Sequence, residues 1–194
     1  MRYFIELSYN GKAYHGWQIQ PNAISVQEVL EKGLSTLLKE PIATMGAGRT
    51  DAGVHATQLF AHFDTEALFD IKTLIYKLNS FLPEDIAIKS IFKVKANSHA
   101  RFHATSRQYL YRIALEKNPF NKEQAFLLKP KLNIDKLKAA TKILLDYKDF
   151  QCFSKSNTDV KTYHCNIMKA EWSLVENELH FIIKADRFLR NMVR

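Results

Sequence analysis

Hydrophobic and polar residues in the N-terminal part of the chain switch repeatedly between a period of two and a helical period. One helix is expected to start at the Ser25–Glu28 capping box and to stop before Pro41. A second is capped by Asp70 and closed by Pro83. Apolar residues at alternate positions predict three strands, over residues 3–9, 57–64 and 86–94. The predicted order is therefore β-α-β-α-β.

A second set of elements follows the polar link at residues 95–99. The pattern predicts a strand in the later part of residues 101–113 and a helix over 133–147. This helix is expected to bury the face that carries Ile134, Leu137, Ala140 and Leu144. Two further alternating segments, residues 164–175 and 178–185, predict a hairpin around Glu176–Asn177. Residues 117–131 are irregular and basic.

These two sets predict an α+β protein of two strand-and-helix halves. We place the N-terminal half at residues 1–105 and the C-terminal half at residues 106–194. Each half is expected to supply part of one larger mixed sheet. The hydrophobic content of 46% is sufficient for a proper core.

The net charge of the chain indicates a polyanionic binding partner. Lysine and arginine number 28 against 20 acidic residues, which gives a net charge of +8 and favours a polyanion through counterion release. The alternative interpretation is general solubility. Lys12, His15, the 117–131 segment and the Lys136 helix would suit an RNA backbone.

Several classes of protein are excluded or disfavoured. Two cysteines, Cys152 and Cys165, are too few and too widely spaced for a zinc site or a disulfide framework, so reduced thiols in a cytoplasmic protein are expected. The N-terminus lacks the regions of a signal peptide, and no apolar run reaches the roughly 18 residues of a membrane span. No metal is implied.

The candidate chemistry lies in the glycine-rich stretch Thr44–Gln58, TMGAGRTDAGVHATQ. A phosphate-binding loop would need a lysine or a third glycine opening a helix, whereas here Asp51 stands at the glycine position and a strand follows. A carboxylate facing a pyrophosphate would be repelled, which sets aside a nucleotide-binding enzyme. Alternatively, Gly46, Gly48 and Gly53 are turn residues only.

Asp51 itself is a candidate nucleophile or general base, because small neighbours allow a substrate to approach its carboxylate. Arg49 would bind a phosphate or keep this carboxylate ionised; the alternative is a plain surface ion pair. His55 is interpreted as structural.

The segment GRTDAGVHATQ closely resembles the signature of the TruA family of tRNA pseudouridine synthases. Other family-like segments occur in the same order, so the resemblance spans the chain: YNGKAYHGWQIQPN, SVQEVLEKGL, ARFHATSRQYLYRI, DFQCFSK and RFLRNMVR. It implies the pseudouridine-synthase fold, with a mixed, mostly antiparallel central sheet flanked by helices.

Carried over to this sequence, the resemblance makes Asp51 the nucleophile that attacks the target uridine, at C6 of uracil or at C1′ of ribose. Arg49 corresponds to the arginine that extrudes the nucleotide or fills its place, and Tyr109 to the tyrosine that stacks on the flipped uracil. Tyr111 lies on the same strand face and can equally be a core aromatic. Arg194 corresponds to the arginine that pairs with Asp51, with Phe188, Leu189, Met192 and Val193 lining or backing the pocket. No cofactor is expected.

The resemblance further implies a homodimer acting on the anticodon stem-loop of tRNA, at positions 38, 39 and 40. Family members continue past Met-Val-Arg with a further helix and a closing segment, so we expect the C-terminal half to be incomplete at Arg194. Two alternatives stay open: a noncatalytic RNA-binding module, and an inactive fragment of such an enzyme.

Overall fold

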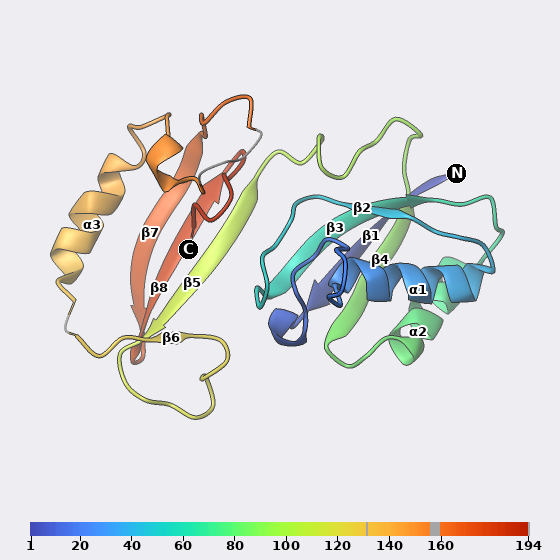
Figure 1. Cartoon of the computed structure of the whole chain (residues 1–194), viewed down its shortest axis with the longest axis horizontal. Helices are drawn as coiled ribbons and strands as arrows, with labels where there is room; N and C mark the ends of the chain where they lie inside the picture. The colour runs from blue at the N-terminus through green and yellow to red at the C-terminus, as the bar shows by residue number, and fades with distance from the viewer. Residues whose placement is uncertain (131, 156–159, 194) are drawn as a thin grey trace. The chain divides into compact units, whose positions relative to one another are not determined.

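A computed structural model describes residues 1–130, 132–155 and 160–193. The chain divides into two compact units, residues 1–104 and 105–194. Each unit contains its own four-stranded sheet (Figure 1). The predicted α+β class and the mixed, mostly antiparallel pairing are confirmed, but the strands form two sheets where a single central sheet was expected.

The N-terminal unit contains the β-α-β-α-β order that the sequence predicts, with one strand added. Its sheet has the order β2-β3-β1-β4, and all its pairs are antiparallel. The added strand, β2, was missed because three residues are too few to show a period. The bounds are Arg2–Tyr9 for β1, Thr44–Gly46 for β2, Ala56–Asp64 for β3, Ile86–Lys93 for β4, Val26–Leu38 for α1 and Ile71–Phe81 for α2.

Both helices of this unit begin at the predicted caps. The Ser25 hydroxyl accepts a hydrogen bond from the Glu28 amide at 3.2 Å, and the Asp70 carboxylate accepts one from the Thr73 amide at 2.8 Å. Apolar side chains of β1, α1 and α2 form one buried core, and the two helices cover one side of the sheet (Figure 1). Ile5 and Leu30 are fully buried within it, and burying a side chain of this size contributes about 1.5–3 kcal/mol.

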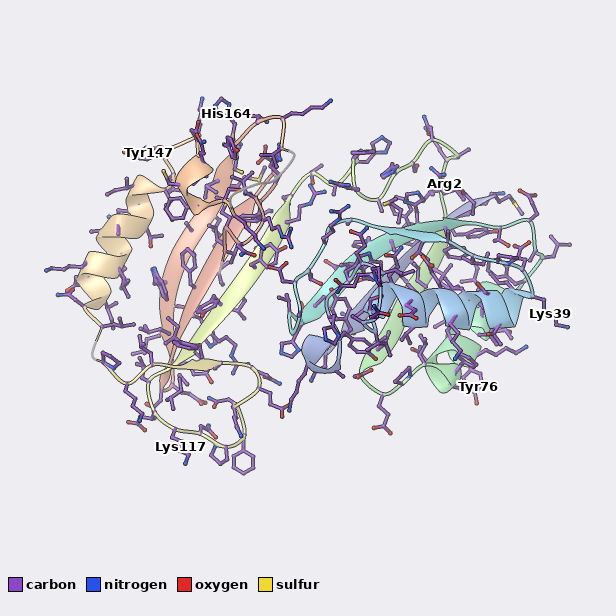
Figure 2. All side chains as sticks on the ribbon, viewed as in Figure 1. Arg2, Lys39, Tyr76, Lys117, Tyr147 and His164 are labelled. Carbon is purple, nitrogen blue, oxygen red and sulfur yellow. The ribbon has the colours of Figure 1, made fainter. Side chains whose placement is uncertain are left out.

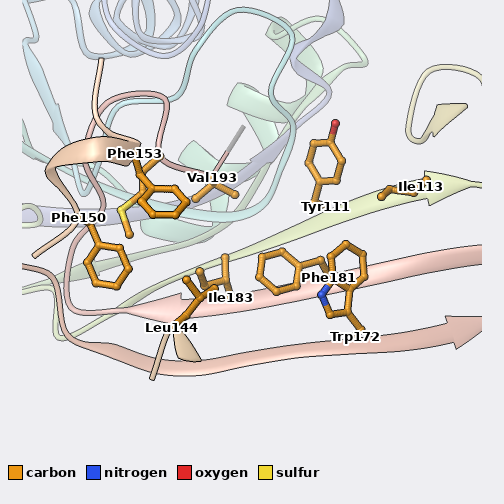
Figure 3. A pocket seen from close by; sticks show the side chains of 10 residues that line it. Tyr111, Ile113, Leu144, Phe150, Phe153, Trp172, Phe181, Ile183 and Val193 are labelled. Carbon is orange, nitrogen blue, oxygen red and sulfur yellow. The ribbon is translucent and has the colours of Figure 1, made fainter. Parts of the chain in front are cut away.

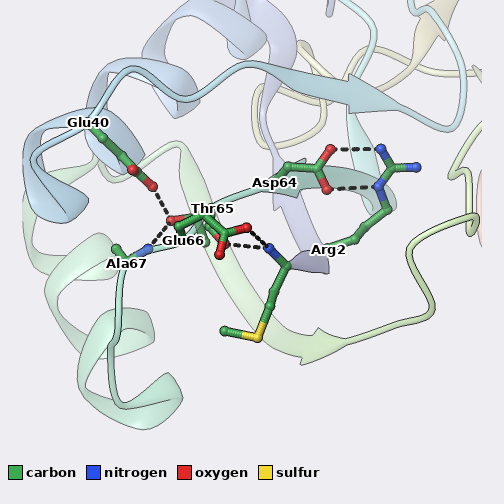
Figure 4. A network of polar contacts seen from close by, with 7 residues as sticks. Arg2, Glu40, Asp64, Thr65, Glu66 and Ala67 are labelled. Atoms are coloured by element: carbon green, nitrogen blue, oxygen red, sulfur yellow. Dashed lines mark hydrogen bonds and ion pairs between the residues drawn. The ribbon is translucent and has the colours of Figure 1, made fainter.

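Polar contacts secure the start of β1 (Figure 4). The Arg2 guanidinium donates two hydrogen bonds to the Asp64 carboxylate across the β1–β3 pair, at 2.9 and 2.7 Å, and it lowers the pKa of Asp64. The N-terminal amine donates to the Thr65 carbonyl at 2.7 Å and pairs with Glu66. These contacts stabilise the end of the sheet where β1 begins, and the candidate site lies at the opposite end.

The C-terminal unit contains the predicted hairpin, with Glu176 at a positive φ of 52° in its turn. The sheet order is β6-β5-β8-β7, with β6 parallel to β5. The sequence did not predict β6, which is two residues long. The bounds are Arg107–Ala114 for β5, Phe126–Leu127 for β6, Ile134–Ile143 for α3, Ile167–Val175 for β7 and Glu178–Ala185 for β8.

Helix α3 differs from its prediction in length and in burial. It ends at Ile143 rather than near Tyr147. Ala140, expected on the buried face, is exposed, whereas Thr141 is buried. The reason is a polar contact to β7, because the Trp172 indole N–H donates to the Thr141 hydroxyl at 2.8 Å. Periodicity counts apolar residues and therefore could not predict this contact.

Two smaller observations complete the fold. Cys152 is exposed and Cys165 is buried, and both are free thiols as predicted. Within the three described ranges, every helix is too short or too polar to cross a lipid bilayer.

Candidate active site

Asp51 lies in the loop that joins β2 to β3 in the N-terminal unit. Its side chain is half-buried, while the neighbouring Ala52 and Gly53 are exposed. The turn is closed by a hydrogen bond from the Val54 amide to the Asp51 carbonyl at 3.2 Å. The predicted nucleophile therefore stands on a short, internally bonded turn with an accessible flank.

Sheet register explains which segments surround this turn. Tyr9, the last residue of β1, is paired with Ala56 at the start of β3 and with Ile86 at the start of β4. Because the three neighbouring strands are antiparallel in the order β3-β1-β4, these ends meet at the same edge. The loop after β1 is thus placed directly beside the loop before β3.

The end of β1 and the loop after it hold the Asp51 turn from both sides. The Tyr9 hydroxyl is 2.9 Å from the Thr50 hydroxyl, and the Trp17 amide donates to the Thr50 carbonyl at 3.2 Å. On the far side of Asp51, the Gly53 amide donates to the Tyr14 carbonyl at 3.2 Å. The backbone is therefore fixed immediately before and shortly after the predicted nucleophile.

Close approach of the two loops depends on a glycine outside the predicted site. At Gly16, a Cβ would lie 2.2 Å from the Thr50 carbonyl oxygen, and the φ angle is +92°. No side chain fits there without moving one loop. This segment resembles the family in sequence, but its pattern predicts no role for Gly16, Tyr14 or Trp17.

The three glycines of the quoted stretch serve different purposes. Gly53 has a φ of +76°, as a turn residue would. Gly46 packs against the Trp17 indole, since a Cβ there would lie 2.6 Å from the ring. Around Gly48 a Cβ would meet nothing within 4 Å. Packing and turn geometry therefore explain two of the glycines, and neither explains Gly48.

The polar residues next to Asp51 are placed as follows. Arg49 is exposed, and no ion pair joins it to Asp51 in the part of the chain that the structure describes. Among those residues, the Asp51 carboxylate accepts no hydrogen bond. His55 accepts a hydrogen bond from the Gly11 amide at its Nδ1, at 3.1 Å. This contact agrees with the structural interpretation of His55.

The C-terminal unit contains the predicted aromatic residues on β5. Tyr109 is half-buried and packs edge-on against Phe188, with ring centroids 5.1 Å apart and an interplanar angle of 81°. Tyr111, two residues further along, is also half-buried. The structure thus brings Tyr109 together with Phe188.

An apolar cleft of about 340 Å³ opens in the same unit (Figure 3). Met192 and Val193 line it, and Leu189 is buried in the adjoining core. The other lining residues come from β5, β7, β8 and the segment after α3: Tyr111, Ile113, Leu144, Phe150, Phe153, Trp172, Phe181 and Ile183. Met192 and Val193 therefore line an apolar cleft of this unit, whereas their place in a pocket with Asp51 stays a prediction. Arg194 lies outside the described residues.

Exposed basic residues occur in each of the segments that the sequence analysis named. Lys12 and His15 are exposed on the loop after β1, Lys117 on the loop that follows β5 (Figure 2), and Lys136 on α3. In the three described ranges, no group of three or more His, Cys, Asp or Glu side chains is arranged to hold a metal ion.

Comparison with known proteins adds the following. Residues 7–103 and 140–194 match a family model described as tRNA pseudouridine synthase. The chain is 52% identical to tRNA pseudouridine synthase A of Azobacteroides pseudotrichonymphae, over 100% of this chain and 78% of that protein. It is 50% identical to the protein of the same name in Bacteroides thetaiotaomicron, of which it covers 73%, and 36% identical to that of Bacillus subtilis, of which it covers 80%. In both of these matches the whole of this chain is covered.

Proposed function

We propose, because this chain belongs to the tRNA pseudouridine synthase family, that it isomerises uridine to pseudouridine in tRNA with Asp51 as the nucleophile. The observation that carries the proposal is the Asp51 turn. Its backbone is bonded at Thr50 and at Gly53, and none of these bonds uses the Asp51 carboxylate. A carboxylate that is held in place through its backbone is free to react.

The reaction balances without a cofactor. The Asp51 carboxylate attacks C6 of the uracil or C1′ of the ribose, and the bond between N1 and C1′ breaks. The base rotates, a bond forms between C5 and C1′, and the bond between Asp51 and C6 or C1′ breaks, so that the carboxylate is regenerated. The hydrogen on C5 leaves as a proton while N1 gains one. Release of the C5 hydrogen to water therefore reports each completed turnover.

The finer parts of the proposal concern substrate and assembly. We place the target uridines in the anticodon stem-loop and the protein in the cytoplasm, acting as a homodimer. The net charge of +8 supports a polyanionic substrate. Arg49, which is exposed and precedes Asp51 by two residues, is proposed to contact a phosphate or to stack in the space of an extruded base.

Two proposed roles involve the C-terminal unit. Tyr109 is proposed to stack on the flipped uracil, which its half-buried position near the start of β5 supports. The role of Arg194 as ion-pair partner of Asp51 stays a prediction. Substituting each residue in the assay below tests its part, since loss of a stacking or pairing group should lower turnover without abolishing tRNA binding.

The test measures tritium released from tRNA that carries [5-³H]uridine. The 194-residue chain is compared with Asp51→Asn, which removes the charge but keeps the shape. Asp70→Asn is the matched control, because asparagine still caps α2. The relative from Bacteroides thetaiotaomicron serves as positive control for the substrate. We expect release by the chain and by Asp70→Asn, and a loss of about a thousandfold or more in Asp51→Asn.

Other outcomes discriminate between the alternatives. Equal release by the chain and by Asp51→Asn would refute the role of Asp51. Binding of tRNA without release, when the positive control is active, would favour the noncatalytic RNA-binding module or the inactive fragment. Binding retained by Asp51→Asn shows that this variant is folded.

A further inference from the structure

Two residues far from Asp51 in the sequence are connected to it by a short chain of hydrogen bonds. We infer that Tyr14 and Asp85 are positioning residues that set the orientation of the Asp51 turn. This inference rests on the proposed function, since it concerns the nucleophile of that reaction. Neither residue was singled out by the sequence analysis.

The chain of bonds begins at Asp85, which lies just before β4. Its carboxylate accepts a hydrogen bond from the Tyr14 hydroxyl at 2.6 Å, and its carbonyl accepts one from the Asn10 amide at 2.8 Å. Asp85 thus holds the loop after β1 at both ends of the 3-10 turn Gly11–Ala13. Because β4 is paired with β1, this anchor belongs to the rigid sheet.

Tyr14 passes the constraint on to the Asp51 turn. Its ring is buried, with 5% of the residue exposed, and its carbonyl accepts the Gly53 amide at 3.2 Å. Burial, together with the hydrogen bond to Asp85, raises the pKa of the Tyr14 phenol well above its usual value. The hydroxyl therefore stays protonated, as a donor must, over the range in which an enzyme works.

Different residues hold the backbone on the two sides of the proposed nucleophile. Tyr9 and Trp17 hold Thr50, the residue before Asp51, whereas Tyr14 holds Gly53, two residues after it. Gly53 has a positive φ, and its amide bond to the Tyr14 carbonyl joins this second side to the loop after β1, in addition to the bond from the Val54 amide to the Asp51 carbonyl within the turn. Releasing it would let the carboxylate rotate away from the reacting carbon, and small misplacements of this kind are costly for turnover.

The experiment combines kinetics with amide exchange. Tyr14→Phe removes only the hydroxyl, and Asp85→Ala removes its acceptor. We expect each variant to lower kcat for tritium release about tenfold or more with KM for tRNA unchanged within about twofold. The double variant should lose no more than either single one, because both break the same link. Asp85→Asn, whose amide oxygen can still accept the hydroxyl, should restore most of kcat.

Tyr3→Phe is the matched control. Tyr3 is a buried tyrosine of the same unit, and its hydroxyl has no hydrogen bond to any residue that the structure describes. We expect this control to keep kcat. Exchange of the Gly53 amide with solvent, measured by NMR, should be about tenfold faster in Tyr14→Phe than in the unmodified chain or in Tyr3→Phe.

The two readouts separate failure of this inference from failure of the proposed function. The positioning role would be overturned by an unchanged kcat, by a rise in KM as large as the fall in kcat, or by losses of kcat that add in the double variant. If the unmodified chain releases no tritium, the proposed function fails by itself. Gly53 exchange then decides whether Tyr14 and Asp85 hold the turn, and exchange that matches the control overturns the inference.

Discussion

Replacing Gly16 by alanine tests whether the two loops at the sheet edge must lie in contact. Gly16 has a φ of +92°, and an added Cβ would stand 2.2 Å from the Thr50 carbonyl oxygen. A residue with a side chain at positive φ costs roughly 1–2 kcal/mol. The overlap can be relieved only by separating the loops.

Separation has a further cost that follows from the contacts at this point. The Trp17 amide donates to the Thr50 carbonyl at 3.2 Å, and the Val26 amide donates to the Gly16 carbonyl at 3.2 Å. Losing one such bond costs about 1 kcal/mol. Together with the backbone term, we expect Gly16→Ala to lower the free energy of unfolding of the N-terminal unit by about 2–3 kcal/mol.

Urea unfolding followed by tryptophan fluorescence measures this change. The chain has two tryptophans, and Trp172 belongs to the other unit, so a Trp172→Phe background leaves Trp17 as the reporter. With a slope of about 2 kcal/mol/M, the midpoint should fall by about 1 to 1.5 M. Gly48→Ala is the matched control, because a Cβ there meets nothing within 4 Å, and it should change stability by less than about 0.5 kcal/mol. Equal midpoints for the two variants would refute the reasoning.

Three more predictions concern acid stability and a helix cap. Arg112, with further hydrogen bonds, lowers the pKa of Glu178 from 4.5 to about 2. This carboxylate therefore stabilises the fold above pH 4.5, and its contribution of about 2–3 kcal/mol is lost as the pH falls toward 2. In urea midpoints measured across this pH range, Glu178→Gln should show a smaller loss of stability. Burial, followed by the charge of Arg2, lowers the pKa of His62 below 6.5. The neutral ring therefore stabilises the fold above pH 6.5, and stability falls as the pH drops below this value. In thermal melts measured at pH values on both sides of 6.5, His62→Asn should remove this dependence. Ser25→Ala removes the cap of α1 and should cost about 1 kcal/mol, seen as a lower urea midpoint of Trp17 fluorescence, and an unchanged midpoint would contradict the cap assignment.

Local patterns predicted most of the fold because they record burial directly. The alternation in β1 and the capping box before α1 are properties of neighbouring residues, and both elements form as expected. The short strand β2 was missed because its existence depends on pairing with β3 and not on its own sequence. The burial of Thr141 in helix α3 was missed for a related reason, since it depends on the hydrogen bond from Trp172 of β7 and not on an apolar period.

The candidate site shows the same division between local and distant information. Asp51 could be found from its own neighbours, because a carboxylate in that position excludes a phosphate loop. Tyr14 and Asp85 could not, since their contact depends on β4 pairing with β1. In the sequence, Tyr14 is an aromatic residue in a polar loop and Asp85 is an acidic residue just before a strand. Neither feature by itself predicts a contact between the two. Sheet order supplied the missing information.

The arrangement around Asp51 would satisfy two requirements of the proposed nucleophilic carboxylate. A carboxylate that accepts several N–H bonds is well oriented but stabilised as an anion, and so it reacts less readily. Here the orienting bonds are made by the hydroxyl and the carbonyl of Thr50, which precedes Asp51, and by the amide of Gly53, two residues after it. The turn can therefore be held rigidly while the carboxylate keeps its lone pairs for the substrate. It follows that substitutions beneath the turn should act on kcat, whereas substitution of exposed Arg49 should act on tRNA binding.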